Sequence, residues 1–186
     1  MRSSIASVVL TALCVTVTPV LEAQTPPAAA VRELTALDYF QIQQLVSKYA
    51  RAIDTCSNNG YDYADLFTAD GAFIPSINGK PGAKIQGRER LAEVSGGGSR
   101  GCKKVGWIEQ GVRHLYVNHI ITPTAEGATG IVDMLMIGLG GDPNKIEYDG
   151  YYEDTYVRTP EGWRFKQRVH HAKLVEGRRV TPPAAK

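Results

Sequence analysis

The apolar residues of the first third of the chain repeat at the spacing of an amphipathic helix. From Thr35 onward, intervals of mostly three or four residues separate the members of one apolar stripe, which are Ile42, Leu45, Val46, Tyr49 and Ile53. Thr35 is a capping residue, and Asp38 adds an acid to the first turn. Because the turn formers CSNNGYD come next, the pattern predicts a buried helix with Asp54 near its C-terminal end.

Shorter elements come after this helix. The stretch YADLFTADGAFIP predicts a second short helix, a turn at Asp70-Gly71 and a first strand from Ala72 to Pro75. GRERLAEVS predicts a third short helix. The Gly-rich segment SGGGSRGCKKVGW, residues 95–107, predicts a loop.

The second half of the chain changes to the period of strands. VRHLYVNHIITPT, GATGIVDMLMIGLG, IEYDGYYEDTYVRT and GWRFKQRVHHAKLV are long, rich in β-branched and aromatic residues, and separated by the turn signals AEG, GGDPN and PEG. Helices followed by a meander of strands favour an α+β fold, with the helices on one face of a curved antiparallel sheet. A sheet that wraps around helices is expected to enclose a mostly apolar pocket.

The N-terminal residues have the pattern of an export signal. Arg2 precedes the apolar run IASVVLTALCVTVTPVL, and LEA before Gln24 offers a cleavage point. We therefore expect a signal peptide over 1–23, a flexible tether over 24–34, one domain over 35–175 and a tail over 176–186. This organisation predicts a periplasmic or secreted protein, with a retained membrane anchor as the alternative.

Composition narrows the class of partner. The 186 residues are 43% hydrophobic and carry a net charge of +2, from 21 basic and 19 acidic residues. This content suits one globular domain. Since no basic block stands out, we expect no nucleic-acid partner and no membrane partner after signal cleavage.

Cleavage of a signal peptide would also remove Cys14. Cys56 and Cys102 would then remain as an even pair, which in an oxidising compartment is a candidate disulfide. The alternative is two unrelated small thiols.

Two polar residues are candidates for acid–base chemistry. Asp54 lies at a helix C-terminus, where the macrodipole disfavours a carboxylate; on helix statistics it simply faces water. In the strand from Val112, alternation places His114, Tyr116 and Asn118 on one face. That row either faces solvent or lines the concave side of the sheet, where His114 is suited to move protons near neutral pH.

The last two strands offer further polar side chains. Tyr151 and Tyr152 should point to opposite faces, so at most one reaches a pocket. Alternation in GWRFKQRVHH places Trp163 with Gln167 on one face, and Arg168 on the other. His170 and His171 should also point apart, and no pair among the four histidines has metal-ligand spacing. We therefore expect no metal and no cofactor.

Taken in order, these segments resemble a known family. Tyr49-x4-Asp54 ends the first helix, YADLFTADGAF comes next, RHLYVN opens a strand, and YYEDTYVRTPEGWRFKQR forms the last hairpin. The set resembles the SnoaL-like group of the nuclear-transport-factor-2-like superfamily, and within it the scytalone dehydratase-like enzymes, from about Thr35 to Leu174. The resemblance implies a cone-shaped α+β fold with a deep pocket between helices and sheet.

The resemblance also implies roles for particular residues. Related dehydratases use a Tyr and an Asp on the first helix with a His on a strand, which here correspond to Tyr49, Asp54 and His114. Asn118 corresponds to a polar pocket position, and Arg168 to a polar pocket residue on the last strand. Tyr116 and Tyr151 are the other residues expected to bind substrate. Relatives are often dimers or trimers, so a homo-oligomer is expected.

These roles lead to a functional hypothesis. We expect a cofactor-independent lyase that eliminates water from a small hydrophobic or aromatic hydroxylated substrate. Carbon–carbon cleavage with release of a small aldehyde, and double-bond isomerisation, are close alternatives. A non-catalytic exported protein that binds a small ligand is the alternative of another class.

A dyad of His114 and Asp54 with a phenol can perform elimination unaided when the substrate already carries an acidic C–H. Activity is therefore expected to survive dialysis against a strong chelator, measured as turnover before and after dialysis. Activity lost on chelation and restored by zinc or iron would contradict this and would implicate His170 or His171 in a metal centre.

Overall fold

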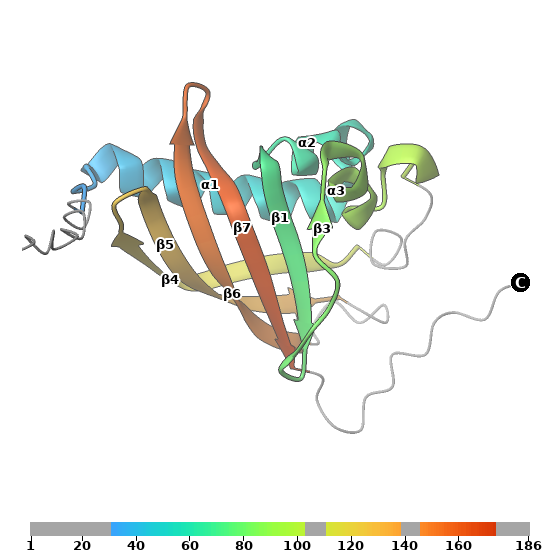
Figure 1. Cartoon of the computed structure of the whole chain (residues 1–186). Helices are drawn as coiled ribbons and strands as arrows, with labels where there is room; N and C mark the ends of the chain where they lie inside the picture. Colours follow the sequence, from blue (N-terminus) through green and yellow to red (C-terminus); the bar gives the residue numbers. More distant parts are fainter. Residues whose placement is uncertain (1–30, 103–110, 139–145, 174–186) are drawn as a thin grey trace, which may run out of the picture.

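The computed structural model describes residues 31–102, 111–138 and 146–173, with the side chains of 147–149 and 173 left aside. The expected signal peptide, the greater part of the tether and the C-terminal tail lie outside these ranges. In Figure 1 the long helix α1 runs along one side of a curved sheet, and two short helices lie beside its C-terminal end. Within the described ranges, no helix is long and apolar enough to cross a membrane.

Helix α1 spans Ala36–Thr55 and packs its apolar stripe against the sheet. Ile42, Leu45 and Val46 are buried, as the spacing predicts, and so are both polar residues of the candidate site on this helix, Tyr49 and Asp54. A capping box closes the N-terminus, in which Thr35 and Asp38 satisfy each other's backbone N–H groups. The stripe therefore fixes how α1 is rotated against the sheet.

A compact corner of short helices lies beside the C-terminal end of α1 (Figure 1). It consists of η1 (Ser57–Gly60), α2 (Tyr61–Ala64), α3 (Arg88–Val94) and η2 (Gly98–Arg100). Two glycines allow its segments to touch through their backbones. A Cβ on Gly60, which has φ of +81°, would lie 2.4 Å from the carbonyl oxygen of Ala92, and one on Gly97 would lie 2.0 Å from that of Asn59. The α2 helix is shorter than the sequence indicated, because strand β1 already begins at Phe67.

In the part of the chain that the structure describes, the sheet has seven strands. They are β1 (Phe67–Ile77), β2 (Lys80–Pro81), β3 (Ile85–Gln86), β4 (Arg113–Pro123), β5 (Gly127–Ile137), β6 (Ile146–Thr159) and β7 (Gly162–Lys173). Their order is β2-β1-β7-β6-β5-β4, with β3 also paired to β1. The α+β fold and the helices on one face are as predicted.

The expectation of a purely antiparallel sheet is wrong at one position. β1 pairs with β7 in parallel, with Phe73 opposite Arg168. The strands β4 to β7 form the predicted antiparallel meander, and β1 joins it at the β7 side from the other end of the chain. Sequence patterns give the period of a strand but not its partner strand. The pairing with β7 extends the sheet beyond the meander by adding β1.

Register shifts interrupt several strand pairs, and two of these shifts change which side chains face the interior. In β4 the register with β5 shifts between Val117 and Ile120, where Asn118 has a positive φ of 54°. In β7 the register with β6 shifts between the pairs Thr155–Gln167 and Tyr156–Phe165. A β-bulge adds one residue to one strand and so turns every later side chain to the opposite face.

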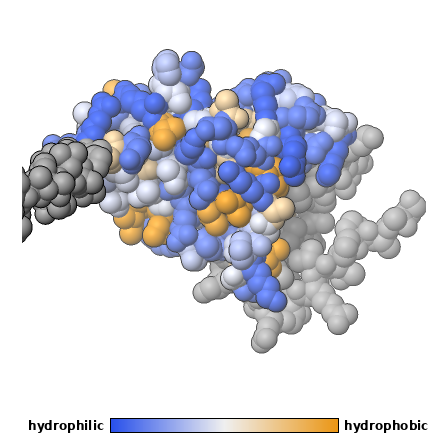
Figure 2. Space-filling model, in the orientation of Figure 1, coloured by the Kyte–Doolittle hydropathy of each residue, from blue (hydrophilic) through white to orange (hydrophobic). Residues whose placement is uncertain are grey.

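The outer face of the sheet is partly apolar. Figure 2 shows apolar patches on a mainly polar surface. The large exposed apolar side chains on β4 and β5 are Leu115, Val117, Ile120 and Ile131. The interior, by contrast, is filled by aromatic rings. Tyr49, Asp54 and His114 are buried there, between α1 and the inner face of the sheet.

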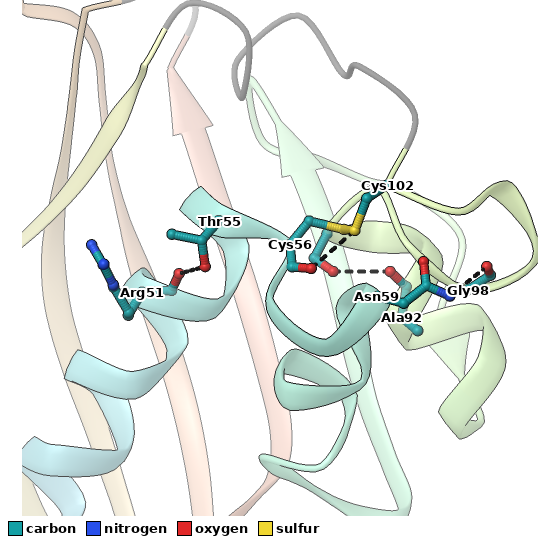
Figure 3. Close-up of a disulfide and its surroundings, with 8 residues drawn as sticks. Arg51, Thr55, Cys56, Asn59, Ala92, Gly98 and Cys102 are labelled. Carbon is teal, nitrogen blue, oxygen red and sulfur yellow. Dashed lines mark hydrogen bonds between the residues drawn. A yellow bond between two sulfur atoms is a disulfide. The ribbon is translucent and has the colours of Figure 1, made fainter.

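Cys56, at the end of α1, and Cys102, after η2, are joined by a disulfide with Cα atoms 5.9 Å apart (Figure 3). This is the pairing that the cysteine count suggested. The bond closes a loop that contains the whole helical corner.

Asp38 fixes the other end of α1. Its carboxylate accepts hydrogen bonds from the backbone N–H of Thr35 at 3.0 Å and from Nε1 of Trp163 at 3.0 Å, and it pairs with Arg158. The bond from the Thr35 backbone is the largest cause that lowers the pKa of Asp38, to about 2. The helix N-terminus is thereby bound to the β6–β7 hairpin.

Asp38→Ala is expected to lower the free energy of unfolding by about 1–3 kcal/mol, since it leaves the buried indole N–H without an acceptor and removes half of the capping box. Because the carboxylate has a lowered pKa in the folded state, its stabilising effect is present above pH 4 and is lost as the pH falls toward 2. Urea unfolding at several pH values should show the gap between wild type and variant closing over that range. Asp62→Ala, at an exposed site in α2, is the control and should change stability by less than about 0.5 kcal/mol. Equal losses of stability in both variants would contradict the role of Asp38 in binding α1 to the β6–β7 hairpin.

Candidate active site

Asp54 and His114 form the centre of the site. Oδ1 of Asp54 lies 2.5 Å from Nδ1 of His114, and Oδ2 accepts the backbone N–H of His114 at 3.1 Å. Both side chains are 5% exposed. Because the carboxylate holds the residue at two points, it fixes both the strand position and the ring orientation of His114.

This geometry assigns the two ring nitrogens of His114. An ionised carboxylate at Oδ1 requires a proton on Nδ1, which leaves Nε2 to accept or release a proton. The two side chains are buried and in direct contact, within hydrogen-bond reach of one another. A ligand would therefore meet the dyad from the Nε2 side of the imidazole.

Tyr49 lies one and a half turns before Asp54 on α1, inside an aromatic cluster. Its hydroxyl accepts a hydrogen bond from the hydroxyl of Tyr63 at 3.3 Å. Its ring lies 5.8 Å from that of Tyr152 and 6.1 Å from that of Tyr116, centre to centre. Burial raises the pKa of Tyr49 well above its ordinary value of 10, so the phenol stays protonated. Tyr49 can donate a proton or hydrogen bond but cannot serve as an anion near neutral pH.

Arg168 is fully buried at the centre of the same cluster. Its Cζ atom lies 4.0 Å from the ring centre of Tyr49 and 3.9 Å from that of Tyr152, so the guanidinium stacks against both. Nε lies 3.2 Å from Oδ1 of Asp154. The bulge in β7 is the reason that Arg168 shares the inner face with Trp163, against the simple alternation of the sequence.

Asp154 belongs to a buried polar chain that sequence reasoning missed. Tyr156 donates a hydrogen bond to Oδ2 of Asp154 at 2.7 Å, and its hydroxyl lies 3.0 Å from Nε2 of His119. Burial raises the pKa of Asp154 to about 6, although Arg168 and Tyr156 oppose this. Burial and the charge of Arg168 lower the pKa of His119 to about 4, so this imidazole is neutral at pH 7.

The bulge in β4 corrects two predictions. Asn118 was expected on the inner face but is exposed and donates from Nδ2 to Asp133 at 2.9 Å. Strict alternation along this strand would place His119 on the face opposite His114, but the bulge turns it inward, and it lies half-buried beside Tyr156. The sequence does contain an indication of this bulge, since an Asn within a strand tolerates the left-handed conformation that a bulge requires.

The prediction for Tyr151 is wrong as well. Its ring points away from the site and stacks on His171 with centres 4.5 Å apart, while Tyr152 takes the inner position. Tyr116 lies inside as predicted, with its ring 5.6 Å from that of Tyr152. The sequence had allowed only one of the two adjacent tyrosines to face inward, and their burial decides which one.

The adjacent histidines of β7 do point apart. His170 stacks on the inner ring of Tyr152 at 4.6 Å, and burial lowers its pKa to about 3. His171 lies on the outer face, 2.8 Å from Oε2 of Glu153. Among residues 31–102, 111–138 and 146–173, no group of three or more His, Cys, Asp or Glu residues is arranged to hold a metal ion.

Surface grooves lie apart from the dyad. One of about 360 Å³ on the outer face is lined by residues that include Ile120, Ile131 and Val169, and another of about 380 Å³ lies between Lys48 and Asp65. Neither is lined by Asp54 or His114. Asp54, His114, Tyr49 and Arg168 are all buried, away from these two grooves.

Comparison with known proteins supports this assignment of the fold. A family model described as a SnoaL-like domain matches residues 34–169. A search among curated protein sequences gave no significant match.

Several solved structures have the same fold. An NTF2-like protein with a cystatin-like fold from Novosphingobium aromaticivorans is 22% identical, with a TM-score of 0.58 over 76% of this chain and 84% of that one. A candidate scytalone dehydratase from the same organism is 20% identical, with a TM-score of 0.56 over 81% and 95%. A structure from Catenulispora acidiphila is 20% identical, with a TM-score of 0.60 over 74% and 92%. At these identities the likeness concerns the fold alone.

Asp154→Asn is expected to remove one pH-dependent component of stability. The folded carboxyl has a raised pKa, so between pH 4 and 6 the folded state retains a proton that the unfolded chain releases. This contribution favours folding below pH 4 and is lost as the pH rises to about 6. Urea unfolding from pH 4 to 7 should show the wild type losing stability relative to the variant over this interval; parallel pH profiles would contradict the raised pKa.

Proposed function

This chain belongs to the SnoaL-like domain family, and on that premise we propose that it is an acid–base lyase of the dehydratase type. The family includes dehydratases and isomerases. The proposed substrate is a small hydrophobic or aromatic compound with a hydroxyl group and an acidic C–H. The observation that carries the proposal is the buried contact of 2.5 Å between Asp54 and Nδ1 of His114.

The proposed reaction begins with proton removal by His114. Nε2 takes a proton from the carbon next to a carbonyl or aromatic activating group, and the electron pair of that C–H bond forms a new double bond. The C–O bond to the hydroxyl group breaks, and the imidazolium returns its proton so that water leaves. Asp54 stabilises the imidazolium through Nδ1–H, which is the role that a buried carboxylate can perform without being protonated itself.

Tyr49 and Arg168 would stabilise the negative charge that develops on the substrate during the reaction. Tyr49 stays protonated and is proposed to donate a hydrogen bond to the developing oxyanion or to the leaving hydroxyl. Arg168, which stacks on the ring of Tyr49 at 4.0 Å, would place a fixed positive charge behind the phenol. Burial strengthens both effects, since water does not screen charges in the interior.

The proposal predicts that Asp54→Asn and His114→Gln each reduce turnover by about 10²–10⁴-fold with the fold intact. Asn keeps the size of Asp54 but cannot stabilise an imidazolium. A panel of hydroxylated aromatic and alicyclic carbonyl compounds, incubated in deuterium oxide, would be followed by mass spectrometry for loss of water and for deuterium uptake at the acidic carbon. His171→Gln is the matched control, because it removes a histidine from the outer face, and it should retain full activity.

Each outcome of that assay has a distinct meaning. Turnover unchanged in Asp54→Asn and His114→Gln would refute the acid–base dyad. A small aldehyde or a shifted double bond as the product would replace elimination by carbon–carbon cleavage or isomerisation. A compound that binds wild type and Asp54→Ala equally, with no turnover and no exchange, would identify a ligand-binding protein instead.

A further inference from the structure

The end of α1 that carries Asp54 is not secured by the helix itself. Asp54 is the next-to-last residue of α1, and helix termini fray because their last carbonyl groups lack partners within the helix. A carboxylate there also opposes the helix dipole, and the last turn contains no basic residue. The position of Asp54 must therefore depend on the turn directly after α1 and on the contacts that hold that turn.

The backbone of this turn is held in an unfavourable conformation. Cys56, Asn58 and Asn59 have positive φ values of 47°, 49° and 53°. Asn tolerates the left-handed conformation, whereas Cys56 keeps it only because surrounding contacts enforce it. Something in the helical corner must hold this turn in place.

Two kinds of contact hold it (Figure 3). Asn59 donates from Nδ2 to the carbonyl oxygen of Gly98 at 3.0 Å, which attaches the far end of the turn to η2. The disulfide attaches the near end, since it joins Cys56, the C-cap of α1, to Cys102. Cys56 lies only two positions after Asp54 in the chain, so the disulfide is the covalent contact nearest to the dyad.

We propose that the Cys56–Cys102 disulfide positions Asp54 against His114. The dyad is then assembled in the oxidised protein and loosened in the reduced one. A dithiol reductant would donate two electrons and two protons, break the S–S bond and leave two thiols, with the dithiol converted to its own disulfide. The proposal rests on the proposed function only in treating the dyad as catalytic.

The geometry of the dyad makes it sensitive to such a change. Asp54 contacts the ring and the backbone of His114 at once, at 2.5 and 3.1 Å. A shift of about 1 Å at the helix end would break at least one of these contacts, and misplacement of that size costs about 10²-fold in rate in acid–base sites. Cys56 and Cys102 are positioning residues, since they touch neither His114 nor a reacting atom.

NMR of the full chain with ¹⁵N-labelled histidine provides the test. In the oxidised protein the Nδ1 proton of His114 should give a downfield resonance, assigned by its loss in Asp54→Asn, that exchanges slowly with solvent. Dithiothreitol, or the double substitution Cys56→Ser with Cys102→Ser, is expected to speed that exchange at least about tenfold or to abolish the resonance. His171, on the outer face, should be unchanged and serves as the internal reference.

A matched variant separates positioning from general stabilisation. Asp38→Ala weakens the same helix at its opposite end but leaves the disulfide intact, so it should lower the melting temperature and keep the His114 resonance. A reduced protein with lower stability and an unchanged His114 resonance would overturn the proposal, because the disulfide would then be only a structural clamp. Since the readout is not activity, failure of the lyase assay would leave this result standing.

Discussion

A carboxylate near each end of α1 binds this helix to a different part of the sheet, and together the two fix how the helix lies across the inner face. Asp38 joins the N-terminus to Trp163 and Arg158 on the β6–β7 hairpin. Asp54 joins the C-terminus to His114 on β4, which is an edge strand, whereas β6 and β7 lie in the middle of the sheet order. Because α1 is held across the inner face at two points, its apolar stripe cannot rotate, and Tyr49 stays directed into the aromatic interior.

The interior combines rings with charges that would be costly to bury alone. Arg168 is compensated by Asp154 and by the faces of Tyr49 and Tyr152. The same low-dielectric surroundings raise the pKa of Asp154 to about 6 and lower that of His170 to about 3. Burial is the main cause that lowers the pKa values of His119 and His170, and the charge of Arg168 adds to it, so both imidazoles are neutral at pH 7.

In the corner after α1, a covalent bond holds a turn whose backbone conformation is strained. Left-handed residues at Cys56, Asn58 and Asn59 turn the chain sharply, and Gly60 and Gly97 let two backbones meet where any side chain would collide. Such a turn places the helix end accurately only while its surroundings hold it. The bond to Cys102 therefore links the geometry of an acid–base pair to the oxidation state of a site outside it.

The sequence by itself determined the helix, the strand-rich second half and the α+β class, because spacing and residue type are local properties. It also paired the cysteines by count. Tyr49, Asp54 and His114 were singled out together by the resemblance to the SnoaL-like group, since the pattern alone left Asp54 facing water. Tertiary structure alone decided the parallel pairing of β1 with β7, the choice of Tyr152 over Tyr151, and the inward positions of His119 and Arg168. For His119 and Arg168 the physical reason is the β-bulge: one extra residue in β4 or β7 reverses which face later side chains occupy, and only pairing with a neighbouring strand determines where that residue is inserted. The partner of β1 and the buried face of β6 depend on contacts between segments far apart in the chain, which local spacing does not contain.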